Sequence, residues 1–190
     1  MAARKPIEVP DAGRRLLLKG LALAPLGLGL AHAPAVHAAA ERALAFRHTH
    51  TGERLEIAYF ARGEYLPAAL ARIDWLLRDF RTGDAHRMEA RLLDVLHALH
   101  AQAGGGEFEV ISGYRSPKTN ARLRHASNGV AEHSLHLEGR AIDVRLTGTH
   151  TARLRDAALA LGLGGVGYYP KSDFVHLDTG RVRHWGPTSA

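Results

Sequence analysis

Apolar and polar residues alternate over residues 46–60 on either side of Thr51-Gly52, and this pattern predicts a β-hairpin. The period of the pattern then changes to that of a helix. Pro67 is suited to the first helical turn. The apolar residues after it recur at helical spacing: Leu70, Ile73, Leu76, Leu77 and Phe80. The sequence therefore predicts an amphipathic helix directly after the hairpin.

A second amphipathic helix is predicted over about residues 85–103, with Asp84 as its N-cap and the glycines at 104–106 as its end. Residues 108–111 are typical of a strand. A Ser-Pro pair then forms a favourable N-cap and first turn, so a short helix is expected over about residues 117–126.

The C-terminal part of the pattern predicts a buried strand at 141–146, a helix at 151–161 and two strands at 164–169 and 174–178. Strands at both ends with helices between them are typical of an α+β fold with a mainly antiparallel sheet and helices packed on it. No repeat, linker or low-complexity stretch interrupts residues 39–190, so this segment is predicted to be one domain.

Residues 1–38 are predicted to be an export signal, with the basic pair Arg14-Arg15, an apolar stretch over 20–35 and small residues before position 38. The stretch is shorter than the ~20 residues that a spanning helix needs. Cleavage is therefore favoured over an anchor, and no stable membrane span is expected afterwards. The arginine pair resembles a twin-arginine signal, which implies the twin-arginine translocase as a transient partner and the periplasm as destination. A Sec signal is the alternative.

Charge and composition narrow the partners of the predicted domain. Residues 1–38 hold five of the 25 Lys and Arg residues and two of the 19 acidic ones, which leaves a net charge of +3 on residues 39–190. No dense basic run with interleaved aromatic residues appears, so nucleic acid is not expected as a partner. A mildly basic protein would still be attracted to an anionic polymer such as the cell wall.

The candidate chemistry lies in Ser-x-His-x-x-Gly-x-Ala-x-Asp, which includes His136 and Asp143, and in Asp-x-x-His, which ends at His176. Two imidazoles and a carboxylate are the ligand set of a catalytic zinc ion, which leaves its fourth position to water. Structural zinc sites usually employ cysteine, and this chain has none. Gly139 permits a tight turn after His136, and Ala141 keeps the neighbouring strand slim.

Three further residues are candidates around this metal. Asp173 precedes His176 by three positions, an odd offset in a strand, so it must lie in a bend if both side chains face the metal. There it could take a proton from water and pass it to the leaving amine. Asp178 shares a strand face with His176 and could instead orient that ligand. Arg115, at a strand end, is suited to grip a carboxylate or a developing oxyanion, although an ordinary surface arginine is the alternative.

At these residues the chain resembles the zinc peptidases of the D-alanyl-D-alanine carboxypeptidase and VanX kind, within the wider group that includes lysostaphin and hedgehog domains. The nearest likeness is to the branch that contains the murein endopeptidase MepK. The matching stretches are ISGYRSPKTNARLR (111–124), VAEHSLHLEGRAIDVRL (130–146) and GGVGYYPKSDFVHLDTGRVRHW (164–185).

The resemblance implies one zinc ion per chain, with His136, Asp143 and His176 as ligands. It also implies that Arg115 holds substrate and stabilises the transition state. The implied function is a periplasmic murein peptidase, an endopeptidase acting on stem-peptide cross-links. A D,D- or L,D-carboxypeptidase or a dipeptidase of the same family is the alternative, and the sequence does not name the scissile bond.

Other positions receive roles from the same likeness. Asp173 takes the place of the catalytic acid/base, where many relatives carry the longer Glu. Ser134 lies where substrate is contacted, and Tyr114, in the matching block around the arginine, is a further candidate to bind substrate. Tyr168 and Tyr169 are candidates to line the cleft, although packing within the sheet is the simpler interpretation.

Two functions of other classes remain as alternatives. In an iron(II) oxygenase, His176, Asp178 and His184 would form a two-histidine, one-carboxylate set. That arrangement would leave His136 and Asp143 unused. A metal-bearing but inactive wall-binding module is the other alternative, and the acid/base candidate together with the arginine argues against it.

Overall fold

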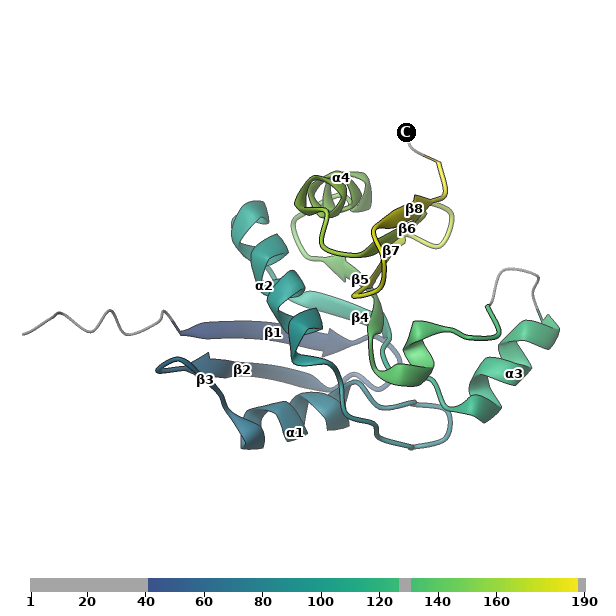
Figure 1. The fold of residues 1–190 in the computed structure, drawn as a ribbon, viewed down its shortest axis with the longest axis horizontal. Helices are drawn as coiled ribbons and strands as arrows, with labels where there is room; N and C mark the ends of the chain where they lie inside the picture. Colours follow the sequence, from purple (N-terminus) through teal and green to yellow (C-terminus); the bar gives the residue numbers. More distant parts are fainter. Residues whose placement is uncertain (1–40, 127–130, 188–190) are drawn as a thin grey trace, which may run out of the picture. The chain divides into compact units, whose positions relative to one another are not determined.

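Eight strands form one open sheet in the computed structural model, which describes residues 41–126 and 131–187 (Figure 1). The strands are β1 (Arg42–His48), β2 (Arg54–Ala61), β3 (Glu64–Tyr65), β4 (Phe108–Ser112), β5 (Ala141–Leu146), β6 (Gly165–Tyr169), β7 (Phe174–Asp178) and β8 (Arg183–Trp185). Their order is β3-β2-β1-β4-β5-β7-β6-β8, and only the β1–β4 and β6–β8 pairs are parallel. The predicted α+β class with a mainly antiparallel sheet is confirmed.

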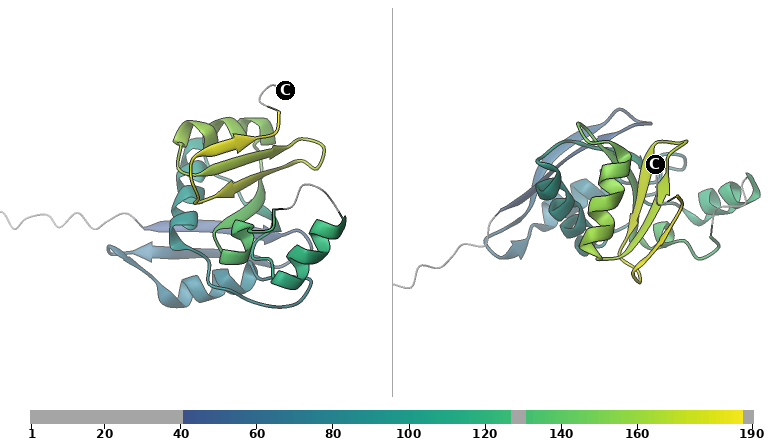
Figure 2. Two further views of the ribbon diagram at one scale, coloured as in Figure 1. Left: turned by 45° about the vertical axis from the view of Figure 1, so that its right-hand side comes forward. Right: turned by 90° about the horizontal axis from the view of Figure 1, so that it is seen from above.

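Helices cover one face of this sheet. The described part contains α1 (Pro67–Leu76), α2 (Ala90–Ala103), α3 (Pro117–Ala126), α4 (Thr151–Leu161) and the short 3-10 helix η1 (Leu135–Glu138). Helices α2 and α4 lie beside each other over the sheet, α1 packs against β2, and α3 projects away at one end (Figures 1 and 2). No helix in the described residues is long and apolar enough to cross a membrane.

Alternation along β5 and β7 gives the sheet two different faces. Ile142, Val144, Val175 and Leu177 are fully or almost fully buried in the core with the leucines of α2. The side chains that alternate with them, Asp143, His176 and Asp178, project from the opposite face because successive residues of a strand point to opposite sides. The core face thus fixes the register that places the polar residues together.

Two predicted helix boundaries are wrong. The first helix ends at Leu76 rather than near Phe80, and the second begins at Ala90 rather than 85. Asp84 is therefore not an N-cap. The segment before α2 is extended because its backbone bonds elsewhere: the Met88 amide donates to Asp74 Oδ1 (2.8 Å) and the Glu89 amide donates to the Gly139 carbonyl (2.9 Å). These tertiary bonds override the local helical pattern.

The other elements were predicted close to their observed limits. The hairpin, the strands at β4 to β7 and the helices α3 and α4 all appear, whereas the short strands β3 and β8 were not predicted. With two and three residues, these edge strands offer too little alternation to be recognised. The predicted export signal at 1–38 lies outside the described residues.

A buried histidine at the end of β1 provides a test of the core at acidic pH. His48 is fully buried, its Nδ1 accepts from the backbone amides of His50 (3.2 Å) and Thr51 (3.4 Å), and its Nε2 has no hydrogen-bond partner among the described residues. Burial, and then the neighbouring His50, lower the pKa of His48 to about 4. The native state therefore holds this imidazole neutral.

We expect the free energy of unfolding to decrease as the pH falls from about 6.5 to 4, because the unfolded chain takes up the His48 proton first. The shift corresponds to a loss of up to about 3 kcal/mol. Urea titrations in chelator at several pH values should show a smaller loss for His48→Asn, whose side-chain oxygen can accept the same two amides. Equal pH dependence of the two proteins would contradict the assignment.

Candidate metal centre and its pocket

One row of residues crosses five neighbouring strands and contains the candidate metal ligands. Strand register aligns Ser112 with Asp143, Asp143 with His176, His176 with Gly167, and Gly167 with Trp185. Because directly paired residues project from the same face, two predicted ligands lie side by side on the face opposite the core. They are separated by 33 positions in the chain but by one strand spacing in the sheet.

The third ligand reaches this row from a loop. His136 lies in η1, which ends at Gly139 in a left-handed conformation (φ 66°). A side chain at Gly139 would also collide with the Arg87 carbonyl, so the predicted tight turn requires glycine here. The turn directs the His136 ring toward β5 and β7, where it is 1% exposed.

Three donor atoms converge in this arrangement. His136 Nε2 lies 3.2 Å from His176 Nδ1 and 3.3 Å from Asp143 Oδ1, and His176 Nδ1 lies 2.8 Å from that same oxygen. Among the described residues, these three side chains form a group whose donor atoms lie close enough together to share one metal ion. The predicted ligand set is thus brought together.

Hydrogen bonds at the far side of each ring determine which nitrogen carries the proton. His136 Nδ1 lies 2.6 Å from the Gly113 carbonyl, and His176 Nε2 lies 3.2 Å from an Asp178 carboxylate oxygen. Both partners can only accept, so both nitrogens carry hydrogen. In neutral rings, His136 Nε2 and His176 Nδ1 then present lone pairs toward each other and toward Asp143. A cation satisfies this arrangement, and the residues therefore fit a bound metal ion.

Burial and charge act in opposite directions on these groups. Burial lowers the pKa of His136, which suits a neutral ligand. Burial alone would raise the pKa of Asp143, but His136, His176 and Arg115 together hold it well below its usual range. Burial alone would lower the pKa of His176, yet its bonds to Asp143 and Asp178 raise it. A carboxylate that stays ionised and a basic imidazole are favourable metal ligands.

Asp178 anchors His176 from behind. Its side chain is fully buried and accepts from His176 Nε2, from the amides of Gly165 (3.1 Å) and Gly180 (2.8 Å), and from Arg183 through two nitrogens (3.0 and 2.7 Å). Gly165 leaves room for this pair, since a side chain there would overlap both Asp178 and Arg183. The structure thus gives Asp178 the position of a group that orients a ligand, as the spacing suggested.

Arg115 lies on the other side of the ligands. Its Nε donates to Ser112 Oγ (2.9 Å), and a terminal nitrogen donates to Asp143 Oδ2. The backbone amide of Arg115 also donates to the His136 carbonyl (3.1 Å), so the arginine and a predicted ligand are held together. Ser116 then caps α3 through its bond from the Thr119 amide (3.2 Å), as predicted.

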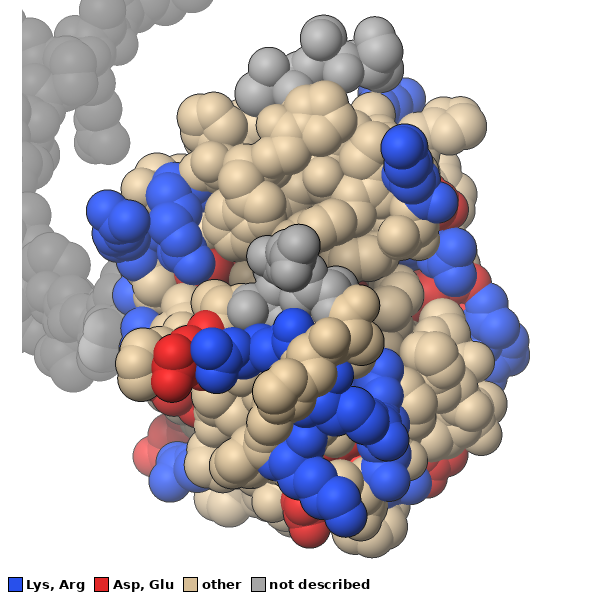
Figure 3. Space-filling model, turned by 90° about the vertical axis from the view of Figure 1, so that its right-hand side faces the viewer, with Lys and Arg blue, Asp and Glu red and all other residues tan. Residues whose placement is uncertain are grey.

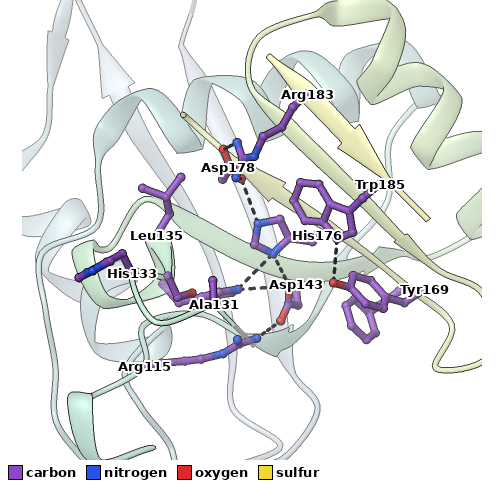
Figure 4. A pocket seen from close by; sticks show the side chains of 13 residues that line it. Arg115, Ala131, His133, Leu135, Asp143, Tyr169, His176, Asp178, Arg183 and Trp185 are labelled. Atoms are coloured by element: carbon purple, nitrogen blue, oxygen red, sulfur yellow. Dashed lines mark hydrogen bonds and ion pairs between the residues drawn. The ribbon is translucent and has the colours of Figure 1, made fainter. Parts of the chain in front are cut away.

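These groups line a cavity of roughly 560 Å³ (Figure 4). Besides the three candidate ligands, the residues around it are Arg115, Ala131, His133, Ser134, Leu135, Tyr169, Phe174, Asp178, Arg183 and Trp185. The structure therefore places the predicted Ser134 and Arg115 at the cavity. A cavity of this size, in which charged and polar side chains converge beside apolar and aromatic ones, has the character of a ligand site.

Asp173 does not line this cavity, which corrects its predicted position. It occupies the expected bend before β7, in a left-handed conformation (φ 50°), but its carboxylate turns away. One oxygen accepts from Thr151 Oγ1 of α4 (2.8 Å) and the other from Arg145 (3.3 Å), and its side chain remains 58% exposed. The sequence located the bend but not its direction. The acid/base role of Asp173 stays a prediction.

Two predicted substrate contacts also lie away from the cavity. Tyr168 is buried on the core side, where the Arg155 guanidinium lies 4.6 Å from its ring centroid. Its neighbour Tyr169 faces the cavity instead, because adjacent strand residues point to opposite faces. Tyr114 stacks on His86, with ring centroids 4.8 Å apart. Neither Tyr114 nor Tyr168 is among the cavity residues.

Trp185 and Arg183 line the cavity but were not predicted from the sequence to do so. Both lie on β8, whose pairing with β6 brings them beside His176 and Asp178. The only signal was their inclusion in the third matching stretch. The alternation of β8 also exposes His184, which is not a cavity residue, so the alternative iron-ligand set is not assembled.

Comparisons with known proteins identify the family of this chain. Residues 36–185 match the model of the family described as peptidoglycan L,D-endopeptidase MepK. The chain is 41% identical over 174 residues to the probable peptidoglycan L,D-endopeptidase MepK of Haemophilus influenzae, an alignment that covers 88% of this chain and 94% of the relative. It is 40% identical over 181 residues to the peptidoglycan L,D-endopeptidase MepK of Escherichia coli K12, covering 92% and 98%. The chain therefore belongs to the MepK family of peptidoglycan L,D-endopeptidases.

Proposed function

We propose that this protein is a zinc-dependent peptidoglycan endopeptidase that hydrolyses peptide bonds in stem-peptide cross-links. The observation that carries the proposal is the convergence of three potential donor atoms, on His136, Asp143 and His176, beside Arg115 in a chain of the MepK family. Two imidazoles and one carboxylate favour zinc over the hard cations, which prefer oxygen ligands. When bound there, zinc supplies Lewis acidity and activates water for attack on an amide.

The residues of the chain prepare the site for that chemistry. Gly113 and Asp178 fix the tautomers of the two imidazoles, so that both ligands are ready without reorganisation. Arg115 holds a charged guanidinium at the edge of the cavity, where negative charge develops on the carbonyl oxygen of an attacked amide. Ser112 and Asp143 accept only two of the five N–H donors of the Arg115 guanidinium. The other donors can therefore bind a substrate carbonyl or carboxylate.

Positive charge next to the cavity favours an anionic substrate. Lys and Arg side chains gather in the lower part of the face shown in Figure 3. On α3, the side chains of Lys118, Arg122 and Arg124 are exposed. Burial lowers the pKa of Arg81, and the positive charges of Arg115 and Arg122 lower it further, against the opposing effect of Asp79. Stem peptides carry free carboxylates, and such a surface would concentrate them near Arg115.

Mass spectrometry of digested sacculi tests the function. Zinc-loaded residues 39–190 should release fragments whose new amino and carboxyl termini lie inside a cross-link. Release of single terminal residues or free dipeptides alone would instead establish the carboxypeptidase or dipeptidase alternative. If the sacculi remain uncleaved after prolonged incubation with the protein, the proposed activity is refuted, and the inactive wall-binding module is the alternative that remains.

Residues 1–38 are further proposed to direct export through the twin-arginine translocase, which would place the enzyme in the periplasm with its substrate. The support is the Arg14-Arg15 pair, followed by an apolar stretch too short for a stable span. A reporter fused to residues 1–45 should lose export when the twin-arginine transporter is deleted. Undiminished export in that strain would support the Sec route.

A further inference from the structure

Three aromatic side chains form one wall of the metal cavity, and the chemistry described above does not use them. Tyr169, Phe174 and Trp185 are each partly exposed, and all three line the cavity. Figure 4 shows Tyr169 and Trp185 on the side of His176 that lies opposite Leu135 and His133. Partly exposed aromatic rings that meet in a cavity are typical of ligand contacts rather than of core packing.

The indole of Trp185 is held in a fixed position next to a metal ligand. Its Nε1 donates to the Tyr169 hydroxyl (2.8 Å), its ring centroid lies 5.1 Å from that of His176, and the Arg183 guanidinium lies 5.1 Å from the centroid. Gly167 lies under the ring, and a side chain there would approach the indole to 2.5 Å. The absence of a side chain at Gly167 thus allows Trp185 to extend across the row toward His176.

The wall continues along the same face of the sheet. Tyr169 pairs directly with Phe174 across β6 and β7, and their rings stack with centroids 4.6 Å apart at 18°. The three rings therefore form one rigid apolar surface that begins beside His176 and runs toward the β6–β7 turn. A rigid surface of this kind binds an apolar group without ordering its own side chains at the moment of binding.

We propose that Trp185, Tyr169 and Phe174 form a specificity subsite that binds the aliphatic side chain of the substrate residue adjoining the scissile bond. This inference rests on the proposed function and names the substrate chemistry of the same cavity. Carboxylates of the substrate would be directed to the opposite side of the cavity, where Arg115 lies. Contact with the aliphatic chain would hold the amide in register over the metal ligands.

Steady-state kinetics on a purified cross-linked muropeptide dimer tests the subsite. Trp185→Ala should lower kcat/KM at least about tenfold, chiefly through KM, because an aromatic contact surface is lost. Trp185→Phe should recover most of that loss, since it keeps an aromatic surface. Trp75→Phe, at an exposed tryptophan of α1 outside the cavity, is the matched control and should match the wild type. Normal KM in folded Trp185→Ala would overturn the proposal.

Fluorescence provides a readout that does not depend on turnover. The chain has two tryptophans, so Trp75→Phe leaves Trp185 as the only one. With zinc binding abolished by His136→Ala, the muropeptide dimer should still shift the Trp185 emission with saturable dependence on concentration. Unchanged emission, at concentrations where the wild type turns over, would refute contact with the wall.

The two experiments separate this inference from the proposed function. If the wild type cleaves no muropeptide, the proposed function fails, whatever the fluorescence shows. If the wild type cleaves and Trp185→Ala cleaves with the same KM, the function stands and the aromatic subsite is refuted. Cleavage by the wild type with a raised KM in Trp185→Ala, and its recovery in Trp185→Phe, supports both.

Discussion

Asp143→Ala is expected to abolish zinc binding and muropeptide hydrolysis together. Asp143 is 2% exposed and its oxygens face His136, His176 and Arg115, so the substitution removes the one anion that contacts all three of these groups among the described residues. The two imidazoles alone cannot hold the ion at comparable affinity. The loss should exceed the roughly 10- to 100-fold that mutation of an outer partner of a metal ligand costs. Competition with a chromophoric chelator measures the affinity, and dimer cleavage measures the activity.

A second variant guards this test against simple unfolding. Asp143→Asn keeps the shape and volume of the side chain, yet its neutral amide cannot supply the charge that zinc requires. Both variants should retain the far-UV circular dichroism of the wild type while failing to bind zinc. If either folded variant hydrolysed muropeptides at the wild-type rate, the metal centre would have to lie elsewhere.

Asp178→Asn is expected to impair catalysis, whereas Asp173→Asn is expected to leave it almost unchanged. Asp178 accepts from five donors on four residues, including His176 Nε2, and an amide nitrogen in place of one oxygen cannot accept. The ligand loses its fixed orientation, so zinc affinity or kcat/KM should fall about 10- to 100-fold. Stability should fall by about 1–3 kcal/mol because buried donors lose their acceptor.

The paired variant at Asp173 isolates the effect of position. Asn tolerates the left-handed conformation that Asp173 adopts, so the exchange removes charge without backbone strain. Exposed substitutions of this type change stability by less than about 0.5 kcal/mol. A large loss of kcat in Asp173→Asn, with normal zinc affinity, would restore the acid/base role that the sequence suggested.

The local pattern of apolar and polar residues was sufficient to predict most helices and strands of the fold. Alternation over β1 and β2, the helical spacing in α1 and α4, and the Ser-Pro start of α3 each report on contacts made within a few residues. The predicted start of α2 was wrong. There Met88 and Glu89 bond to Asp74 and Gly139, residues 14 and 50 positions away, and no local pattern reports such bonds.

The sequence by itself determined which residue types are available to hold a metal, because His136, Asp143 and His176 stand in motifs whose spacing suits a turn and two paired strands. It also determined that no cysteine competes for that role. Only the tertiary structure decided where the neighbouring carboxylates point. Asp173 turns to Thr151 of α4 and Asp178 turns to His176, since strand register and backbone conformation, rather than separation in the chain, set the direction of a side chain. The same register brought Trp185 to the metal ligands, across strands that the chain order does not make neighbours.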